Sequence, residues 1–362
     1  MGNKIAFILN YAPHYRLFIY KGISESLNAD FYFGDLPGTS IKKCDYNKLH
    51  NFKKEFVTIK FKSFYWHIGS FFLIFKPYKR YILTGDPYIL SNWMLLFLAK
   101  LLGKETYLWT HGWYGKESGL TGIIKKIYFR LANKLLLYGD YSKSLLINQG
   151  FDEKRLTVIY NSLDYEKQVE IRKSLKKSNL YKEHFDNDYP VLFYIGRVQQ
   201  SKKLEQILEA MSLLMQKGVF TNLSIVGGID SNYNFVDVIK KFDLERYVWL
   251  VGPLYNEIEI ANYIYNADVC VSPGNVGLTA LHALIYDTPV ITHNNFKKQM
   301  PEFETIIEGV NGMFYEENNV DDLSSKINLL LKMNLSSVEI SAVIHEKWNP
   351  INQINIFKKN LA

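Results

Sequence analysis

The sequence has few cysteines, no long apolar run and no secretion signal. Cys44 and Cys270 are the only cysteines, too few for a disulfide framework or a thiolate zinc site, which favours a reducing, cytoplasmic setting. No segment approaches the roughly 18 uninterrupted apolar residues of a membrane span. The first residues, MGNKIAFILNYAPHYR, contain only a very short apolar run and do not resemble a signal peptide. We expect a soluble or peripheral protein.

Several common catalytic and phosphate-binding motifs are also missing. There is no P-loop G-x-x-x-x-G-K-[ST], no G-x-G-x-x-G after the first apolar run and no G-x-S-x-G nucleophile elbow. A D-x-D sequence, Asp186-Asn187-Asp188, lies in a hydrophilic segment instead of at the end of an apolar strand. We interpret it as a solvated loop, so no metal site is predicted.

The chain does have the composition of a folded α/β protein. Its 362 residues, 48% hydrophobic and 15% aromatic, indicate two domains and exclude a disordered or fibrous chain. Apolar runs of strand length alternate with amphipathic runs of helix length, which predicts doubly wound parallel sheets covered by helices. The predicted strands are 5–10, 81–85, 105–110, 134–139, 191–196, 222–227, 247–252, 268–272 and 289–292. The predicted helices are 17–27, 90–102, 119–132, 204–216, 234–243 and 278–286.

The domain boundaries follow from a polar segment that ends in a proline, IRKSLKKSNLYKEHFDNDYP. We place an N-terminal domain at 1–170, a linker at 171–189 and a C-terminal domain at 190–344. The segment of about 345–362, with Trp348 and Phe357, is expected to form a helix that packs back on the N-terminal domain. Ligands of open α/β sheets bind at the carboxyl ends of the strands, so we expect a cleft between the two sheets there.

The net charge of +7 is unevenly distributed. Residues 1–190 carry 29 Lys/Arg and 17 Asp/Glu, a net of +12, which leaves −5 for residues 191–362. The excess is densest at 51–130, where 13 cations meet 4 anions among many aromatic residues. This pattern fits a solvated basic face over an aromatic core, a patch for an anionic membrane surface, or a nucleic-acid site. Nucleic acid ranks last because no binding signature for it is present.

Candidate ligand-binding groups lie at strand ends in the second half. Gly196 and Arg197 end one predicted strand, and Lys202 follows five residues later. An arginine fork and a lysine could together neutralise a diphosphate, although two solvated cations are the simpler interpretation. A second strand leads into Pro273-Gly274-Asn275-Val276-Gly277 and then a helix, whose free N–H groups could bind an anion.

Taken in order, these motifs resemble a known family. GR-xxxx-K, IVGG, VGPL, SPGNVGLTALHALIYDTPVIT and PEFETIIEGVNGMFY are similar to segments of the retaining, nucleotide-sugar-dependent glycosyltransferases of family 4, or glycosyl transferases group 1. The likeness extends upstream over 135–164 and is weakest over 1–104. It implies the GT-B fold, in which two Rossmann-like domains face each other across a cleft.

The resemblance also implies roles for individual residues. Arg197 and Lys202 match the basic pair that holds the donor diphosphate and offsets the charge on the leaving group. His111 falls where the family lines the donor sugar or the acceptor, and a structural histidine is the alternative. His14 and Arg16 occupy a similar position in the first strand-to-helix loop and are expected on the acceptor side. The implied donor-binding residues are Gly196, Gly227, Gly274, Asn275, Val276, Gly277, Leu278, Thr279, His282 and Glu304.

The sequence departs from the family at three places. Gly274 and His282 stand where the family has two glutamates seven residues apart, and Lys203 stands where a glycine usually follows the phosphate-binding lysine. Glu302 and Glu304 both lie near the family's Pro-Glu element. An imidazole can still hydrogen-bond a ribose hydroxyl, whereas Gly274 has no side chain to offer.

The resulting hypothesis is an enzyme that moves a sugar from a nucleotide-diphosphate sugar to an acceptor with retention of configuration. It implies no metal and no cofactor beyond the donor itself. The basic N-terminal domain suggests a glycan or lipid-linked glycan acceptor at the inner face of the cytoplasmic membrane, in bacterial surface polysaccharide synthesis. The missing carboxylates motivate two alternatives, a catalytically inactive GT-B binding or scaffold protein and a GT-B nucleotide-sugar epimerase.

Overall fold

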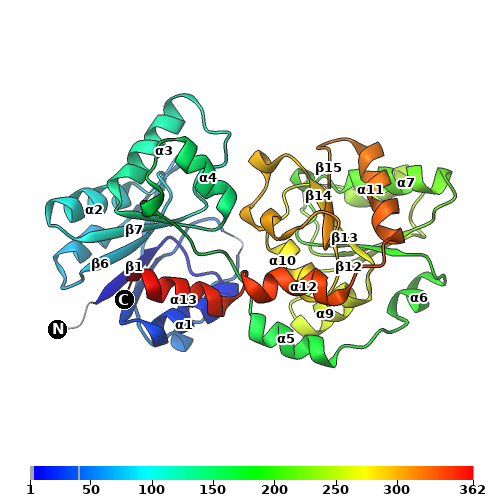
Figure 1. The fold of residues 1–362 in the computed structure, drawn as a ribbon, viewed down its shortest axis with the longest axis horizontal. Coiled ribbons are helices and arrows are strands. Elements are labelled where there is room, and N and C mark those ends of the chain that lie inside the picture. Colours follow the sequence, from blue (N-terminus) through cyan, green and yellow to red (C-terminus); the bar gives the residue numbers. More distant parts are fainter. Residues whose placement is uncertain (1–3, 40, 362) are drawn as a thin grey trace. The chain divides into compact units, whose positions relative to one another are not determined.

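The chain forms two compact units, each built on one parallel sheet. The computed structural model describes residues 4–39 and 41–361. The first unit comprises Met1–Asp164 with Asn349–Ala362, and the second comprises Tyr165–Trp348. In both units helices cover the two faces of the sheet (Figure 1). The α/β class predicted from the alternation of apolar runs is confirmed.

The first sheet has seven parallel strands in the order β3-β2-β1-β6-β7-β8-β9. The central strands are apolar on both faces because helices bury both, as in the fully buried run IAFIL of β1. Strand order reverses between β1 and β6. The strands are β1 Ile5–Leu9, β2 Ala29–Gly34, β3 Phe52–Phe56, β6 Arg80–Thr84, β7 Glu105–Thr110, β8 Lys134–Leu137 and β9 Leu156–Val158. A separate antiparallel hairpin is formed by β4 Thr58–Phe61 and β5 Phe64–His67.

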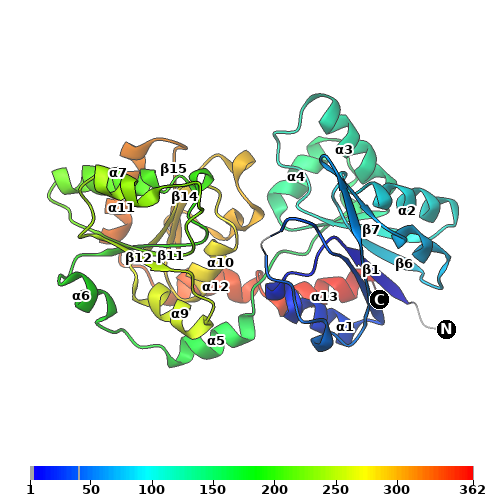
Figure 2. The same ribbon diagram turned by 180° about the vertical axis from the view of Figure 1, so that it is seen from behind.

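Two groups of helices cover this sheet. On one face lie α1 (Leu17–Ser26) and the C-terminal helix α13 (Pro350–Leu361), which pack on each other (Figure 2). Phe357 of α13 is fully buried against Phe7 and Trp109 of the sheet. The other face is covered by α2 Leu90–Leu101, α3 Gly119–Leu131 and α4 Asp140–Asn148.

The second sheet has six parallel strands in the order β12-β11-β10-β13-β14-β15, which reverses between β10 and β13. The strands are β10 Val191–Ile195, β11 Asn222–Val226, β12 Val248–Gly252, β13 Val269–Ser272, β14 Val290–His293 and β15 Gly312–Tyr315. The apolar side chains of α7 (Glu205–Gln216), the helix predicted at 204–216, are buried together with those of α11 (Val320–Lys332) in one core. The helices are α5 Tyr165–Ser174, α6 Leu180–Phe185, α7 Glu205–Gln216, α8 Phe235–Lys241, α9 Glu257–Asn266, α10 Leu278–Ile285, α11 Val320–Lys332 and α12 Ser337–Glu346.

The division of the chain differs from the predicted linker at 171–189. The units divide between Asp164 and Tyr165, and the predicted linker lies inside the second unit as the end of α5 and the helix α6. Both helices pack on α9, with Ile171 and Tyr181 buried. The polar composition of these two segments did not indicate helices, because only about one side chain in each turn reaches the core. At the carboxyl end, the second unit extends to Trp348, and α13 belongs to the first unit.

Candidate functional site

The reversal of strand order in the second sheet brings two glycine-rich strand ends together. Gly196 follows β10, and the loop 273–277 follows the neighbouring strand β13. Gly227, after β11, lies so close to Gly196 that a Cβ atom at Gly227 would be 1.8 Å from the carbonyl oxygen of Gly196. Open α/β sheets bind ligands at such a reversal. The structure therefore brings most of the predicted donor-binding residues to one edge of one sheet.

Lys202 connects the first of these loops to the second. It ends the short 3-10 helix η5 (Gln200–Lys202), and its Nζ donates to the backbone oxygen of Asn275 at 3.1 Å and to Oδ1 of Asn275 at 2.7 Å. Burial lowers the pKa of Lys202. An ammonium group has three donors, so one remains for a ligand. Arg197 is exposed at the same edge, and its carbonyl oxygen accepts from the hydroxyl of Tyr194 at 3.2 Å.

The close packing of these loops explains the glycine at position 274. A Cβ atom there would lie 2.8 Å from the carbonyl oxygen of Ser201 and 2.9 Å from Cα of Lys202. Both are backbone atoms that cannot rotate away. The family glutamate that Gly274 replaces therefore has no space in this arrangement, and Gly274 offers a ligand only its backbone.

The beginning of α10 is fixed by hydrogen bonds to strand β10 and to the segment that follows β14. Thr279 Oγ1 donates to the carbonyl oxygen of Ile195 in β10 at 3.0 Å, and the N–H of Val276 donates to Oε1 of Gln299 at 2.7 Å. Val276 is buried, so its N–H and side chain both serve the protein. The N–H groups of Gly277 and Leu278 open the helix, where no intrahelical acceptor exists, so they are donors that a ligand anion could use.

His282 lies one turn further along α10 and contacts a carboxylate from another helix. Its Nε2 is 2.9 Å from Oε1 of Glu257, at the first residue of α9. Burial alone would raise the pKa of Glu257, but hydrogen bonds from His282, Gln168 and Tyr286 lower it to about 2. With Nε2–H donated to Glu257, a neutral imidazole presents Nδ1 as an acceptor. A carboxylate is thus present near the position where the family has its second glutamate.

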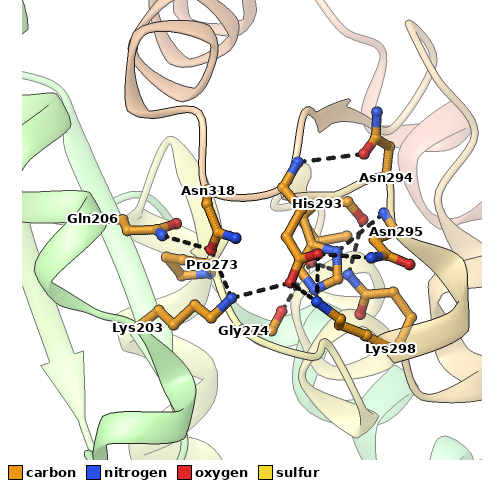
Figure 3. Close-up of polar contacts among 12 residues, drawn as sticks. Lys203, Gln206, Pro273, Gly274, His293, Asn294, Asn295, Lys298 and Asn318 are labelled. Atoms are coloured by element: carbon orange, nitrogen blue, oxygen red, sulfur yellow. Dashed lines mark hydrogen bonds and ion pairs between the residues drawn. The ribbon is translucent and has the colours of Figure 1, made fainter.

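Lys203 occupies the glycine position of the family and keeps the glycine conformation. Its φ is 53°, in the left-handed region, which costs a side-chain-bearing residue about 1–2 kcal/mol. Its Nζ pairs with Glu317 at 3.1 Å and Asn318 at 2.7 Å, beyond the end of β15 (Figure 3). Burial would raise the pKa of Glu317, but hydrogen bonds from Lys298, Asn295 and Lys203 lower it to about 2. This network joins η5 to the neighbouring strand ends.

The remaining predicted donor residue is Glu304. It lies in the 3-10 helix η7 (Pro301–Thr305) and is partly exposed, whereas Glu302 of the same helix is buried. Only Glu304 of these two therefore has a carboxylate open to solvent to any extent.

The first unit has a cavity of about 560 Å³ at the corresponding reversal of its own sheet. Asn10 after β1 and Gly85 after β6 lie on its wall, together with Arg16 and His111. The guanidinium of Arg16 stacks on Trp109 and Tyr138, with ring centroids at 5.5 and 5.2 Å. Its buried Nε finds no hydrogen-bond partner within the described part of the chain. The cavity thus combines aromatic walls with an arginine that can donate to a ligand.

His111 is uncharged at neutral pH. Burial lowers its pKa to about 4, and the positive charges of Arg16 and Lys125 act in the same direction. Its ring packs on Tyr138, at a centroid distance of 4.8 Å. His14 is exposed, and its Nδ1 lies 3.1 Å from the carbonyl oxygen of Lys42. Among the residues described, the cavity wall includes Arg16 and His111 but not His14.

Two residues that hold the candidate site of the second unit in place were not predicted from the sequence. Glu257 holds His282, and Gln299 holds the loop before α10 through Val276, Thr292 and the carbonyl oxygen of His293. The signal for Glu257 was Asn256, whose side chain caps α9 and marks the start of a helix. Gln299 gave no local signal, because it belongs to no sequence motif and its contact with Val276 spans 23 residues.

Comparison with known proteins agrees with this geometry. Residues 176–344 match the family model for glycosyl transferases group 1. Over 220 residues the chain is 23% identical to the capsular polysaccharide biosynthesis glycosyltransferase CapM of Staphylococcus aureus, covering 58% of this chain and 55% of CapM. It is 22% identical over 216 residues to the N,N'-diacetylbacillosaminyl-diphospho-undecaprenol alpha-1,3-N-acetylgalactosaminyltransferase of Campylobacter jejuni, covering 57% and 53%. The chain thus matches about half the length of these relatives.

A solved structure covers the whole chain. The crystal structure of Anabaena HepE in complex with UDP has a TM-score of 0.73 and 14% sequence identity, and the match covers 99% of both chains. At this identity the likeness establishes the fold alone. The chain therefore has the GT-B fold of two Rossmann-like domains, and residues 176–344 of its second domain are similar to the glycosyl transferases group 1 family.

Proposed function

We propose that this protein is a glycosyltransferase that moves a sugar from a nucleotide-diphosphate sugar to a glycan or lipid-linked glycan, with retention of configuration, in bacterial surface polysaccharide synthesis. The observation that carries the proposal is the contact of Lys202 with the loop before α10, at the strand reversal where Arg197 follows β10, in a region that matches the glycosyl transferases group 1 model. Two cationic residues and the free N–H groups of a helix start suit one diphosphate.

The donor diphosphate binds against these groups in the proposed reaction. Arg197 and Lys202 offset the negative charge that grows on the diphosphate as the glycosidic bond breaks, the role a metal ion plays in D-x-D enzymes. Because they supply this charge, we propose a metal-independent reaction without a cofactor beyond the donor. The departing diphosphate accepts the proton of the acceptor hydroxyl on the same face of the sugar, which yields retention.

The nucleoside end of the donor is assigned to His282. Its Nδ1 can accept a hydrogen bond from a ribose hydroxyl while Glu257 holds Nε2. This arrangement replaces a glutamate that would reach the ribose directly. It keeps a negative charge nearby and presents an imidazole to the donor, so it favours catalytic use of the site over a scaffold that needs no ribose contact.

The acceptor is assigned to the cavity of the first domain. His111 is neutral there and can accept a hydrogen bond from a sugar hydroxyl, while Arg16 donates to an oxygen-rich or anionic group. The aromatic walls suit the apolar face of a sugar ring. Because the curated relative from Campylobacter jejuni carries diphospho-undecaprenol in its name, we propose a lipid-linked acceptor at the inner face of the cytoplasmic membrane.

A transfer assay tests this function. Purified protein is incubated with a panel of nucleotide-diphosphate sugars and polyprenyl-linked acceptors, and products are read by mass spectrometry and anomeric NMR. We expect one donor to react, and Arg197→Ala or Lys202→Ala to reduce kcat about 100-fold or more. Lys240→Ala, an exposed lysine of α8, serves as the matched control.

Three results would contradict the proposal. Binding without turnover for every donor would favour the inactive scaffold, and conversion of the donor sugar without acceptor would favour an epimerase. An active enzyme whose rate is unchanged in Arg197→Ala would refute the assignment of the diphosphate site.

A further inference from the structure

Helix α2 of the first domain is apolar on the side that faces away from its core. Its inner side chains, such as Leu95 and Leu96, are fully buried. The outer ones recur at helical spacing and are 40–67% exposed: Leu90, Met94, Phe97 and Leu101. A soluble helix normally shows polar residues on that side, and a helix that is apolar all round needs a second apolar environment.

Helix α3 has the same property. Gly122, Tyr128 and Phe129 face the core, whereas Leu120, Ile123, Ile124 and Ile127 are 40–71% exposed. These four residues fall on one stripe, because they repeat at intervals of three and four. Helices α2 and α3 are neighbours in the first domain (Figure 1). Each of the two therefore has an exposed apolar stripe.

The surface continues onto two smaller elements. The hairpin exposes Ile59, Phe61 and Phe64, and the 3-10 helix η3 (Ser70–Phe75) exposes Phe72 and Phe75. Helix α2 contacts β5 of the hairpin, η3 and α3, so the four elements form one continuous surface within the first domain. We call the exposed apolar side chains of α2, α3, η3 and the hairpin the apolar face. Large exposed apolar patches mark interaction sites.

Positive charge accompanies the apolar face. From Val57 to Leu131 the sequence has eleven Lys and Arg but three Asp and Glu. Glu105 and Glu117 are already ion-paired with Arg80 and Lys125. Exposed cations lie in the same elements or at their ends: Lys60, Lys62, Lys76, Lys100, Lys116 and Arg130. A second copy of the same face would bring like charges together, whereas an anionic lipid surface complements them.

We propose that the apolar face docks on an anionic membrane surface. The stripes of α2 and α3 enter the boundary between headgroups and acyl chains, and the lysines meet lipid phosphates. No single helix among the described residues is long and apolar enough to cross a membrane. One pair, Val320–Lys332 with Ser337–Leu361, passes by composition but is bent by 108°, and it buries Leu323, Ile327 and Phe357 in the domain cores.

The position of this face fits a lipid-linked acceptor, a step that rests on the proposed function. Tyr88, just before α2, and Thr121, in α3, line the cavity assigned to the acceptor and are both exposed. A sugar carried by a membrane lipid could enter the cavity beside α2 and α3 while its lipid stays in the bilayer.

Vesicle flotation tests the docking surface. Full-length protein is mixed with vesicles of phosphatidylcholine and phosphatidylglycerol, or of phosphatidylcholine alone, at low and high salt. The double variant Phe97→Asp with Ile123→Asp places charge on both stripes, and Leu329→Asp with Val338→Asp is the matched control on exposed apolar residues of the second domain. Lys60→Glu with Lys62→Glu tests the charges, against Lys240→Glu with Lys241→Glu.

We expect wild type to bind the anionic vesicles, binding to fall at high salt, and both first-domain variants to bind at least tenfold more weakly. The controls should bind like wild type. Unchanged binding of the Phe97 and Ile123 variant, or equal binding to neutral vesicles, would overturn the proposal. A dimer without lipid that Phe97→Asp dissociates would assign the face to a second copy instead. Circular dichroism confirms folding, and because flotation needs no turnover, its failure is separate from failure of the transferase activity.

Discussion

Gly274 offers the sharpest test of how the donor loops are built. The substitution Gly274→Ala adds one methyl group that would lie 2.8 Å from the oxygen of Ser201 and 2.9 Å from Cα of Lys202. Ordinary contact begins at 3.4 Å, so η5 must retreat by about 0.5 Å. Overpacking of this kind costs about 1–3 kcal/mol. Lys202 moves with η5, away from the position that we assign to the diphosphate.

Two assays measure the consequences. Because each kcal/mol lowers the Tm of a domain of 150–250 residues by about 2–4 °C, we expect the second domain to melt roughly 2–12 °C lower. A displacement of this size should also reduce kcat/KM about tenfold or more, since misplacing a catalytic group by 1 Å costs about 100-fold. Gly274→Glu, which restores the family residue, should have a lower Tm and a lower kcat/KM than Gly274→Ala.

Gly228→Ala is the control, because no atom lies within 4 Å of the added methyl group. Its Tm and kcat/KM should match those of wild type. If Gly274→Ala instead kept both values, or if Gly274→Glu gave a more active enzyme of unchanged stability, the steric explanation for the missing glutamate would be refuted.

Three further predictions concern titratable groups. Glu317→Gln should destabilise the second domain by about 1.5–3 kcal/mol, the contribution of hydrogen bonds to a charged group. Because the pKa of Glu317 is lowered to about 2, the stability that its carboxylate contributes is present above pH 4.5 and is lost as the pH falls toward 2. Urea unfolding at several pH values would show this loss. The imidazole of His111 should titrate by NMR with a midpoint near pH 4, and a midpoint near 6.5 would show that it is not desolvated. Glu257→Gln should raise the donor KM about tenfold, because His282 loses a charged partner. The control Glu259→Gln, on the same helix, should leave the donor KM unchanged. Equal donor KM values in the two variants would show that Glu257 is not part of the site.

Much of the fold could be predicted because both faces of the central strands are buried. Runs such as IAFIL and VLFYI contain no charged residue, and Gly196 marks the end of the second. The strands at the edges of the sheets were harder to predict from the sequence. The strand β3, FKKEF, shows little regular alternation of polar and apolar residues and is half exposed. The strand β15 has only four residues. Neither segment therefore showed a pattern that indicates a strand. The helix α5 was missed because its mean composition is polar.

The residues of the candidate site could be predicted from the sequence where a single segment contains them. They could not be predicted where the site depends on contacts between segments that are far apart in the sequence. Arg197, Lys202 and the loop before α10 were found because strand ends and glycines mark them. Glu257 was not predicted as a site residue, because its partner His282 is 25 residues away in the sequence. The left-handed backbone of Lys203 and the contact that excludes a side chain at Gly274 depend on tertiary packing that spacing cannot reveal.

The central claim is that Arg197 and Lys202 bind the diphosphate of the donor. Isothermal titration calorimetry with nucleoside diphosphates and the matching nucleosides tests it directly on wild type, Arg197→Ala and Lys202→Ala. We expect one diphosphate to bind wild type and to bind each variant at least tenfold more weakly, with the weak affinity for the nucleoside unchanged. Equal affinity of the diphosphate for wild type and Arg197→Ala would contradict it.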